Sequence, residues 1–205
     1  MNGIYKLQLT TVLLALLVLV GCAKAPTAEI EAAGQTMDQA RAAGAGEYAA
    51  DSLKAAEDAR ALLDTELKAQ EERFALVRSY DKASELAAAA KAAAQQAEQD
   101  AIEGRNRARE EAATLIAEVR ASLTEVKNLL DRAPSGKGTA VDLAAMRADL
   151  SAIEESLTQV DSDFAAERYL ESKTGAQVAR DKARSIESEI LRAMEASQKR
   201  PTRRS

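Results

Sequence analysis

Apolar residues recur at helical spacing along most of the chain after residue 27. Within each stripe the apolar positions lie mostly three or four residues apart, the spacing of one face of an α-helix. Such stripes run over residues 53–74, 83–94, 108–130, 143–160 and 176–194. The pattern predicts an all-α protein: an elongated, alanine-rich helical bundle built of coiled-coil hairpins.

Turn-forming residues indicate where these helices end. Gly44-Ala45-Gly46 supplies positions that tolerate a positive φ, so a first helix at about 28–43 ends there. The clearest loop signal is Ala133-Pro134-Ser135-Gly136-Lys137-Gly138. The stretch 75–82 contains neither glycine nor proline, but Ser79 is a favourable N-cap residue and could begin a new helix there.

A faint internal repeat favours one turn in each half of the chain. At an offset of about 90 residues, the apolar positions of 53–74 recur in 143–164 and those of 80–94 recur in 169–183. The register slips by one residue between the phenylalanine and the tyrosine of each half, where a turn would tolerate the slip. Turns are therefore expected near Arg78 and near Glu167.

These turns favour a spectrin-like pair of bundles that share one long central helix. That helix would run over about 81–131 and span roughly 75 Å at 1.5 Å per residue. Two helices would pack on its first half and two on its second. The alternative is two very long helices, at about 50–131 and 140–197, joined at the loop around Pro134.

The N-terminal segment has the features of a bacterial export signal. Lys6 supplies a positive charge, and the apolar stretch from Leu7 to Val20 is too short to cross a hydrocarbon core of about 30 Å as a helix. Leu19-Val20-Gly21-Cys22 resembles the lipobox of bacterial lipoproteins, in which the signal is cleaved before a cysteine that is then lipidated. The resemblance implies cleavage after Gly21 and membrane attachment through Cys22. The alternative is an ordinary secretory signal whose lone cysteine has no role.

The residues after Cys22 bear on the destination of the protein. Ala23-Lys24 follow the cysteine, with no aspartate in first place. By resemblance to lipoprotein sorting in two-membrane bacteria, this implies the outer membrane, facing the periplasm. The segments predicted are a signal peptide (1–21), a lipidated tether (22–27), a first bundle with the central helix (28–131), a loop (132–139), a second hairpin (140–197) and a disordered basic tail (198–205).

Composition excludes several kinds of chemistry. The chain has no histidine and one cysteine, so zinc sites built on these residues, Ser-His-Asp and Cys-His arrangements and structural disulfides within the chain are impossible. Gly136-Lys137-Gly138 does not complete a phosphate-binding loop, because Asp131 stands in place of the first glycine. The formal net charge of −5 argues against nucleic acid as a partner. No catalytic residue, metal or cofactor is expected.

The first half of the chain resembles a known family. Tyr48-Ala49-Ala50-x-x-Leu53-x-x-Ala56, with Phe74 and Tyr80-x-x-Ala83-x-x-Leu86-Ala87-x-x-Ala90, is similar to the bacterial domain of unknown function 4398 over roughly residues 28–101. The resemblance implies an exported lipoprotein of a few alanine-rich helices with no established activity. Arg78-Ser79-Tyr80 replaces the Gly-Asp-Tyr turn usual in that family.

The expected function is a non-enzymatic, lipid-anchored scaffold or spacer in the bacterial cell envelope. The alternative is an adaptor that binds an envelope protein or a cell-wall partner through its helical hairpin tips, with Tyr80 and Tyr169 as possible contacts because tyrosine is favoured at interfaces. Arg203 and Arg204 of the basic tail could contact anionic groups of peptidoglycan or lipid by charge attraction. The alternative, which is the more common role of such a charged end, is that both arginines belong to a solvated, disordered chain end.

Overall fold

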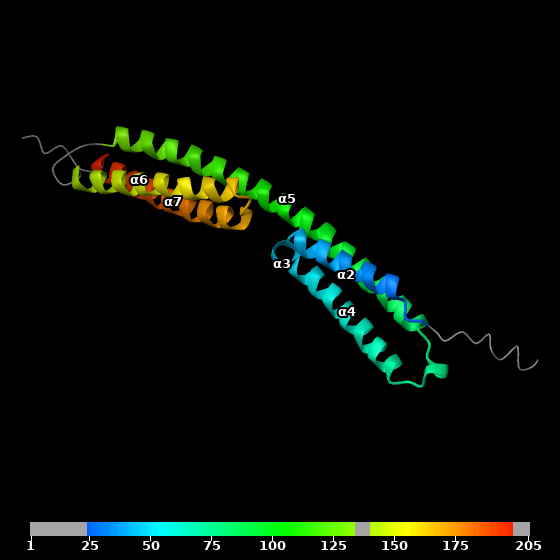
Figure 1. Ribbon diagram of the computed structural model, residues 1–205. Coiled ribbons are helices and arrows are strands. Elements are labelled where there is room, and N and C mark those ends of the chain that lie inside the picture. The colour runs from blue at the N-terminus through cyan, green and yellow to red at the C-terminus, as the bar shows by residue number, and fades with distance from the viewer. Residues whose placement is uncertain (1–23, 134–139, 199–205) are drawn as a thin grey trace, which may run out of the picture. The chain divides into compact units, whose positions relative to one another are not determined.

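The computed structural model describes residues 24–133 and 140–198 (Figure 1). All regular structure in these two ranges is helical, with no strand, which confirms the prediction of an all-α bundle. The elements are α2 (Thr27–Ala42), α3 (Ala45–Tyr48), α4 (Ala50–Glu71), the 3-10 turn η1 (Ala75–Val77), α5 (Asp81–Arg132), α6 (Ala140–Ala165) and α7 (Tyr169–Gln198). The chain divides into two compact units: unit 1 extends to Glu103 and unit 2 begins at Gly104, so that α5 belongs to both.

Unit 1 packs α2, α4 and the first part of α5 around a core made mainly of alanine. Three successive clusters join these helices, and the fully buried alanines among them are Ala40, Ala45, Ala56, Ala83, Ala87, Ala94, Ala97 and Ala101. Leu63 and Met37 are the larger buried side chains of this core. Alanine lets helices approach closely but removes little apolar area from water.

The end of α2 follows the sequence prediction. Gly44 adopts φ 87°, the left-handed conformation that glycine accepts at low cost, and its N–H donates to the carbonyl of Arg41 at 3.0 Å. The chain then forms the short α3 before α4, an element that the sequence analysis did not predict. Ala45, the first residue of α3, is fully buried against Ala97 and Ala101 of α5, which fixes this helical turn in place.

Unit 2 packs the rest of α5 against α6 and α7 around larger side chains. Leucine, isoleucine and valine from all three helices form one continuous cluster, which includes Val119, Ile153 and Ile190 at full or nearly full burial. Helices α6 and α7 approach closely near Gly175, where an added Cβ would lie 2.7 Å from Cγ2 of Val160.

Two turns decide between the architectures considered from sequence. The chain leaves helical structure between Glu71 and Asp81 except for η1, and again between Ala165 and Tyr169. The alternative of two uninterrupted helices, at 50–131 and 140–197, is therefore wrong. The boundary between the two compact units falls within α5, whereas the predicted segments assign the whole central helix to the first bundle.

Candidate functional site

The residues predicted to carry function fall into two groups. Gly21, Cys22, Arg203 and Arg204 lie outside the described residues, so the predictions made for them stay predictions. Tyr80 and Tyr169 both lie in described segments, next to the two helix-joining turns. Their surroundings differ sharply.

Tyr169 belongs to the interior of unit 2. Its side chain is buried, and its ring makes an edge-to-face contact with Phe164, with 5.3 Å between ring centroids. The guanidinium of Arg105 lies 5.9 Å from the centroid of the same ring. These contacts show Tyr169 as a packing residue, so a partner could reach it only after the bundle end opened. It has no part in the proposals below.

Tyr80 immediately precedes α5 and is half-buried. It packs against the cluster of Leu63, Ala83 and Ala87, and its carbonyl accepts the N–H of Ser84 at 2.9 Å in the first turn of α5. Tyr80 therefore closes the end of the unit 1 core. The more exposed groups lie just before it in the chain.

Residues 73–78, which we name the apolar loop, carry the main exposed apolar surface at this end of unit 1. Phe74, Leu76 and Val77 are 72%, 66% and 64% exposed, although their side chains are large and hydrophobic. Arg73 and Arg78 flank them. Side chains of this kind gathered in one short segment are typical of a contact with a partner or a membrane.

The base of the apolar loop is held by specific hydrogen bonds. Arg78 donates from Nη2 to the carbonyl of Glu71, the last residue of α4, at 2.9 Å, which satisfies an acceptor left free at the helix end. It also donates from Nε to the carbonyl of Arg73, within the loop, at 3.0 Å. The buried Gln70 accepts the N–H of Ser79 at 3.1 Å through its Oε1. The exposed apolar side chains thus project from a fixed base.

The apolar loop lies at the end of unit 1 where the described chain begins. Ile30, in the first turn of α2, packs against the same buried cluster as Leu67, near the end of α4, and Tyr80, which precedes α5. Figure 1 shows the start of α2 and the segment containing η1 at this same end of the unit. Residues 24–26, which follow the predicted lipidation site, therefore share an end of the bundle with the loop.

The sequence analysis singled out Phe74 as a residue near a turn but missed Leu76 and Val77. The signal was available: Phe74-Ala75-Leu76-Val77 is a continuous apolar run between two arginines, and it breaks the three-and-four spacing on either side. A run with no helical period cannot lie on one face of a helix. The run therefore marks the segment as unusual, while its exposure depends on the packing around it, because runs of this length also occur in buried segments.

A second candidate is an open groove of about 540 Å³ between α2 and α4. Its charged groups pair with one another. Arg41 contacts Glu57 at 2.9 Å and Asp38 at 3.6 Å, and Arg60 contacts Asp64 at 3.0 Å. All five side chains are at least one-third exposed. The groove holds mutually compensated surface charges, which gives no unpaired group to recognise a ligand.

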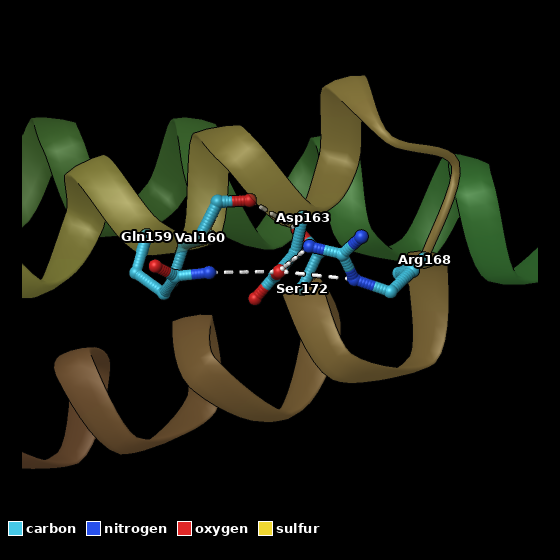
Figure 2. Close-up of polar contacts among 5 residues, drawn as sticks. All are labelled: Gln159, Val160, Asp163, Arg168 and Ser172. Atoms are coloured by element: carbon cyan, nitrogen blue, oxygen red, sulfur yellow. Dashed lines mark hydrogen bonds and ion pairs between the residues drawn. The ribbon is translucent and has the colours of Figure 1, made fainter.

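The third candidate is the polar cluster at the turn between α6 and α7, shown in Figure 2. Asp163 accepts hydrogen bonds from Nη2 of Arg168 at 2.5 Å and from Nε2 of Gln159 at 2.9 Å. The bond from Arg168 holds the pKa of the Asp163 carboxyl below its usual value, with a smaller contribution from Gln159. Ser172, fully buried, donates from Oγ to the carbonyl of Val160 at 2.9 Å. Every polar group of this cluster serves the turn itself.

The backbone explains why this cluster is needed. Glu167 adopts φ 62°, a left-handed conformation that is unfavourable for a residue with a side chain. The N–H of Arg168 donates to the carbonyl of Asp163 at 2.9 Å, and the N–H of Glu167 donates to that of Phe164 at 3.1 Å. This is the Schellman pattern of a helix end. The side-chain bonds of Asp163 hold the same turn, so the cluster has a structural role.

Neither a metal site nor a membrane-crossing helix is found in the part of the chain that the structure describes. Over 24–133 and 140–198, no three acidic or cysteine side chains gather as metal ligands, and no helix is long and apolar enough to cross a bilayer. Comparison with protein families, curated proteins and solved structures finds no match to this chain.

Proposed function

We propose that this protein is a non-enzymatic scaffold or spacer of the bacterial cell envelope, attached by a lipid on Cys22 to the outer membrane and facing the periplasm. The observation that carries the proposal is Leu19-Val20-Gly21-Cys22 at the end of a short apolar segment. Stable anchoring needs more than one acyl chain. Lipoproteins with this sequence motif generally carry three, so the lipid alone would hold the protein at the membrane.

The described body of the protein supports a structural role. Helix α2 begins at Thr27, so only a short tether separates Cys22 from a packed bundle. Catalysis requires a set of groups fixed in a concave site that excludes water. The groove and the polar cluster described above offer mutually paired surface charges and a helix end instead.

Helix α5 supports the proposed role as a spacer. A single helix, Asp81–Arg132, contributes to the cores of both units. We propose that this sharing is of the spectrin-like kind, in which a continuous helix connects successive bundles. The similarity to domain of unknown function 4398 over residues 28–101 is part of the same proposal, because that family consists of alanine-rich helical lipoproteins.

The proposal is tested by lipid labelling in cells. Cells expressing the full chain or Cys22→Ala are grown with radiolabelled palmitate and their membranes are fractionated. Ala23→Ser serves as the matched control, because it changes the neighbouring residue and leaves the thiol. We expect label in the outer-membrane fraction for the wild type and for Ala23→Ser, and none for Cys22→Ala. A soluble, unlabelled wild-type protein would refute the anchor.

A further inference from the structure

We infer that the apolar loop is a second membrane contact, which inserts Phe74, Leu76 and Val77 into the surface of the same membrane that holds the lipid on Cys22. This inference rests on the proposed lipid anchor and deepens it. The partner is the interfacial region of the bilayer, where headgroups meet acyl chains. Short apolar segments gain there by burying their side chains about 5–10 Å deep.

The first support is the character of the loop. Its three large apolar side chains are each more than three-fifths exposed, while the base of the loop is held by Arg78 and Gln70. The hydrogen bonds of Arg78 to the end of α4 and within the loop keep the apolar side chains pointing away from the unit 1 core. A segment held in this way exposes its apolar surface to whatever lies beyond the end of the bundle.

The second support is the position of the loop relative to the tether. Five residues of chain lead from Cys22 to Thr27, which limits their separation to about 18 Å at full extension. Ile30, Leu67 and Tyr80 all pack against the cluster of Leu63, Ala83 and Ala87, and α4 continues past Leu67 to Glu71 before the loop begins. The loop therefore projects from the tethered end of unit 1, within reach of the surface in which the lipid is embedded.

Other partners for the apolar loop fit less well than the interfacial region of a bilayer. A dimer through the loop alone would involve three large apolar side chains per copy, whereas a stable interface needs about 20–30 residues on each side. The charges around the loop balance: the three cations Arg73, Arg78 and Lys82 are opposed by the three anions Glu71, Glu72 and Asp81. Attraction to anionic lipid is therefore not the driving force, and the loop should insert into a zwitterionic membrane.

Insertion of the apolar loop would fix the orientation of unit 1 on the membrane. A lipid on a flexible tether holds a protein near a membrane without fixing its orientation. A second contact at the same end of unit 1 restricts the bundle to orientations in which that end faces the bilayer. The apolar loop would thus determine which surface of unit 1 is presented to the periplasm.

The test uses the absence of tryptophan from the chain. Phe74→Trp introduces a single tryptophan, which can be excited selectively over the tyrosines, at an exposed position of the loop. Leu62→Trp is the matched control, because Leu62 is a 60% exposed leucine of α4 in the same unit, about 14 Å of helix away from Glu71. Each full-length variant is purified in lipidated form and reconstituted into phosphatidylcholine vesicles whose acyl chains carry bromine, a quencher that acts at short range. Circular dichroism checks that each variant retains its helices.

We expect Phe74→Trp to lose most of its fluorescence in brominated vesicles and to shift its emission to shorter wavelength. Leu62→Trp should keep its fluorescence. Adding Leu76→Ser and Val77→Ser to Phe74→Trp should abolish the quenching, which shows that the loop, rather than the new indole, drives insertion. If both single-tryptophan proteins float with the vesicles and are quenched equally little, the inference is wrong and the lipid anchor stands, leaving the loop for a protein partner. If neither protein floats, the anchor itself fails, and the inference fails with it.

Discussion

We predict that Leu63→Ala destabilises unit 1 far more than Leu62→Ala, although the two leucines are neighbours on α4. Leu63 is fully buried against Ala83 and Ala87 of α5, whereas Leu62 is 60% exposed. The two substitutions remove the same atoms from the same helix. Differences in helix propensity therefore cancel, and the comparison isolates the contribution of burial.

The expected magnitude follows from what surrounds Leu63. Removing the equivalent of three buried methylene groups costs about 2.4 kcal/mol in lost transfer free energy, at about 0.8 kcal/mol each. Ala83 and Ala87 are too short to reach into the space, and the larger side chains at the edge of the cluster can fill it only in part, so a cavity cost is added. We expect a total of about 3–4 kcal/mol, within the range measured for leucine in protein cores. Leu62→Ala should cost about 0.5 kcal/mol or less, as for other exposed positions.

Hydrogen exchange followed by mass spectrometry on the full chain is the suitable assay, because it reports each unit separately. A loss of about 3 kcal/mol corresponds to roughly hundredfold faster exchange of the protected amides. We expect this acceleration in peptides from α2, α4 and the start of α5 for Leu63→Ala, and almost none for Leu62→Ala. Equal exchange in the two variants would show that Leu63 does not hold the alanine core together.

Three further predictions concern unit 2. Gly175→Ala should destabilise it by about 1–3 kcal/mol, because the new methyl group would press on Val160. Gly34→Ala in α2 is the control, since there is room for a methyl group there, and it should be neutral or stabilising. A melting temperature that falls in both variants would contradict this prediction. The folded-state pKa of Asp163 lies below its ordinary value of 3.8, so its contribution is complete above that pH and is lost as the pH falls through the lower folded-state pKa. The difference in melting temperature between wild type and Asp163→Asn should therefore shrink below about pH 4, and a constant difference would argue against it. Leu123→Asp should unfold unit 2, because it places a charge in the core; unchanged exchange protection in α6 and α7 would refute that core assignment.

The sequence predicted the long helices closely, because their periodic stripes are long. The central helix was expected over 81–131 and is observed over Asp81–Arg132, and the first was expected over 28–43 and is observed over Thr27–Ala42. Helix α3 was missed because four residues are too few to show a period. Its formation depends on the burial of Ala45 against α5, which is a tertiary contact.

The exposure of the aromatic residues could not be predicted from their positions in the repeat. Phe164 and Tyr169 flank a tight turn, which brings their rings together beside Arg105. Phe74 and Tyr80 lie within a longer connection, over 72–80, in which Tyr80 packs against the core while Phe74 is exposed. Similar residues in similar order thus form an interior contact in one unit and an exposed apolar segment in the other. Whether the aromatic residues are buried or exposed therefore follows the length of the connection between the helices. The helical periodicity of the sequence does not predict that length.

The continuity of α5 also affects the order in which the chain can fold. Starting a helix is the unfavourable step, because several backbone dihedral angles are fixed before the first hydrogen bond forms, while each later residue adds a bond. Unit 1 is complete once the chain has been made to Glu103, and N-terminal portions generally fold first during synthesis. Residues from Gly104 onward then extend an existing helix instead of starting one. Helices α6 and α7 therefore meet a partner that is already ordered, and a single nucleation event in α5 serves two hydrophobic cores.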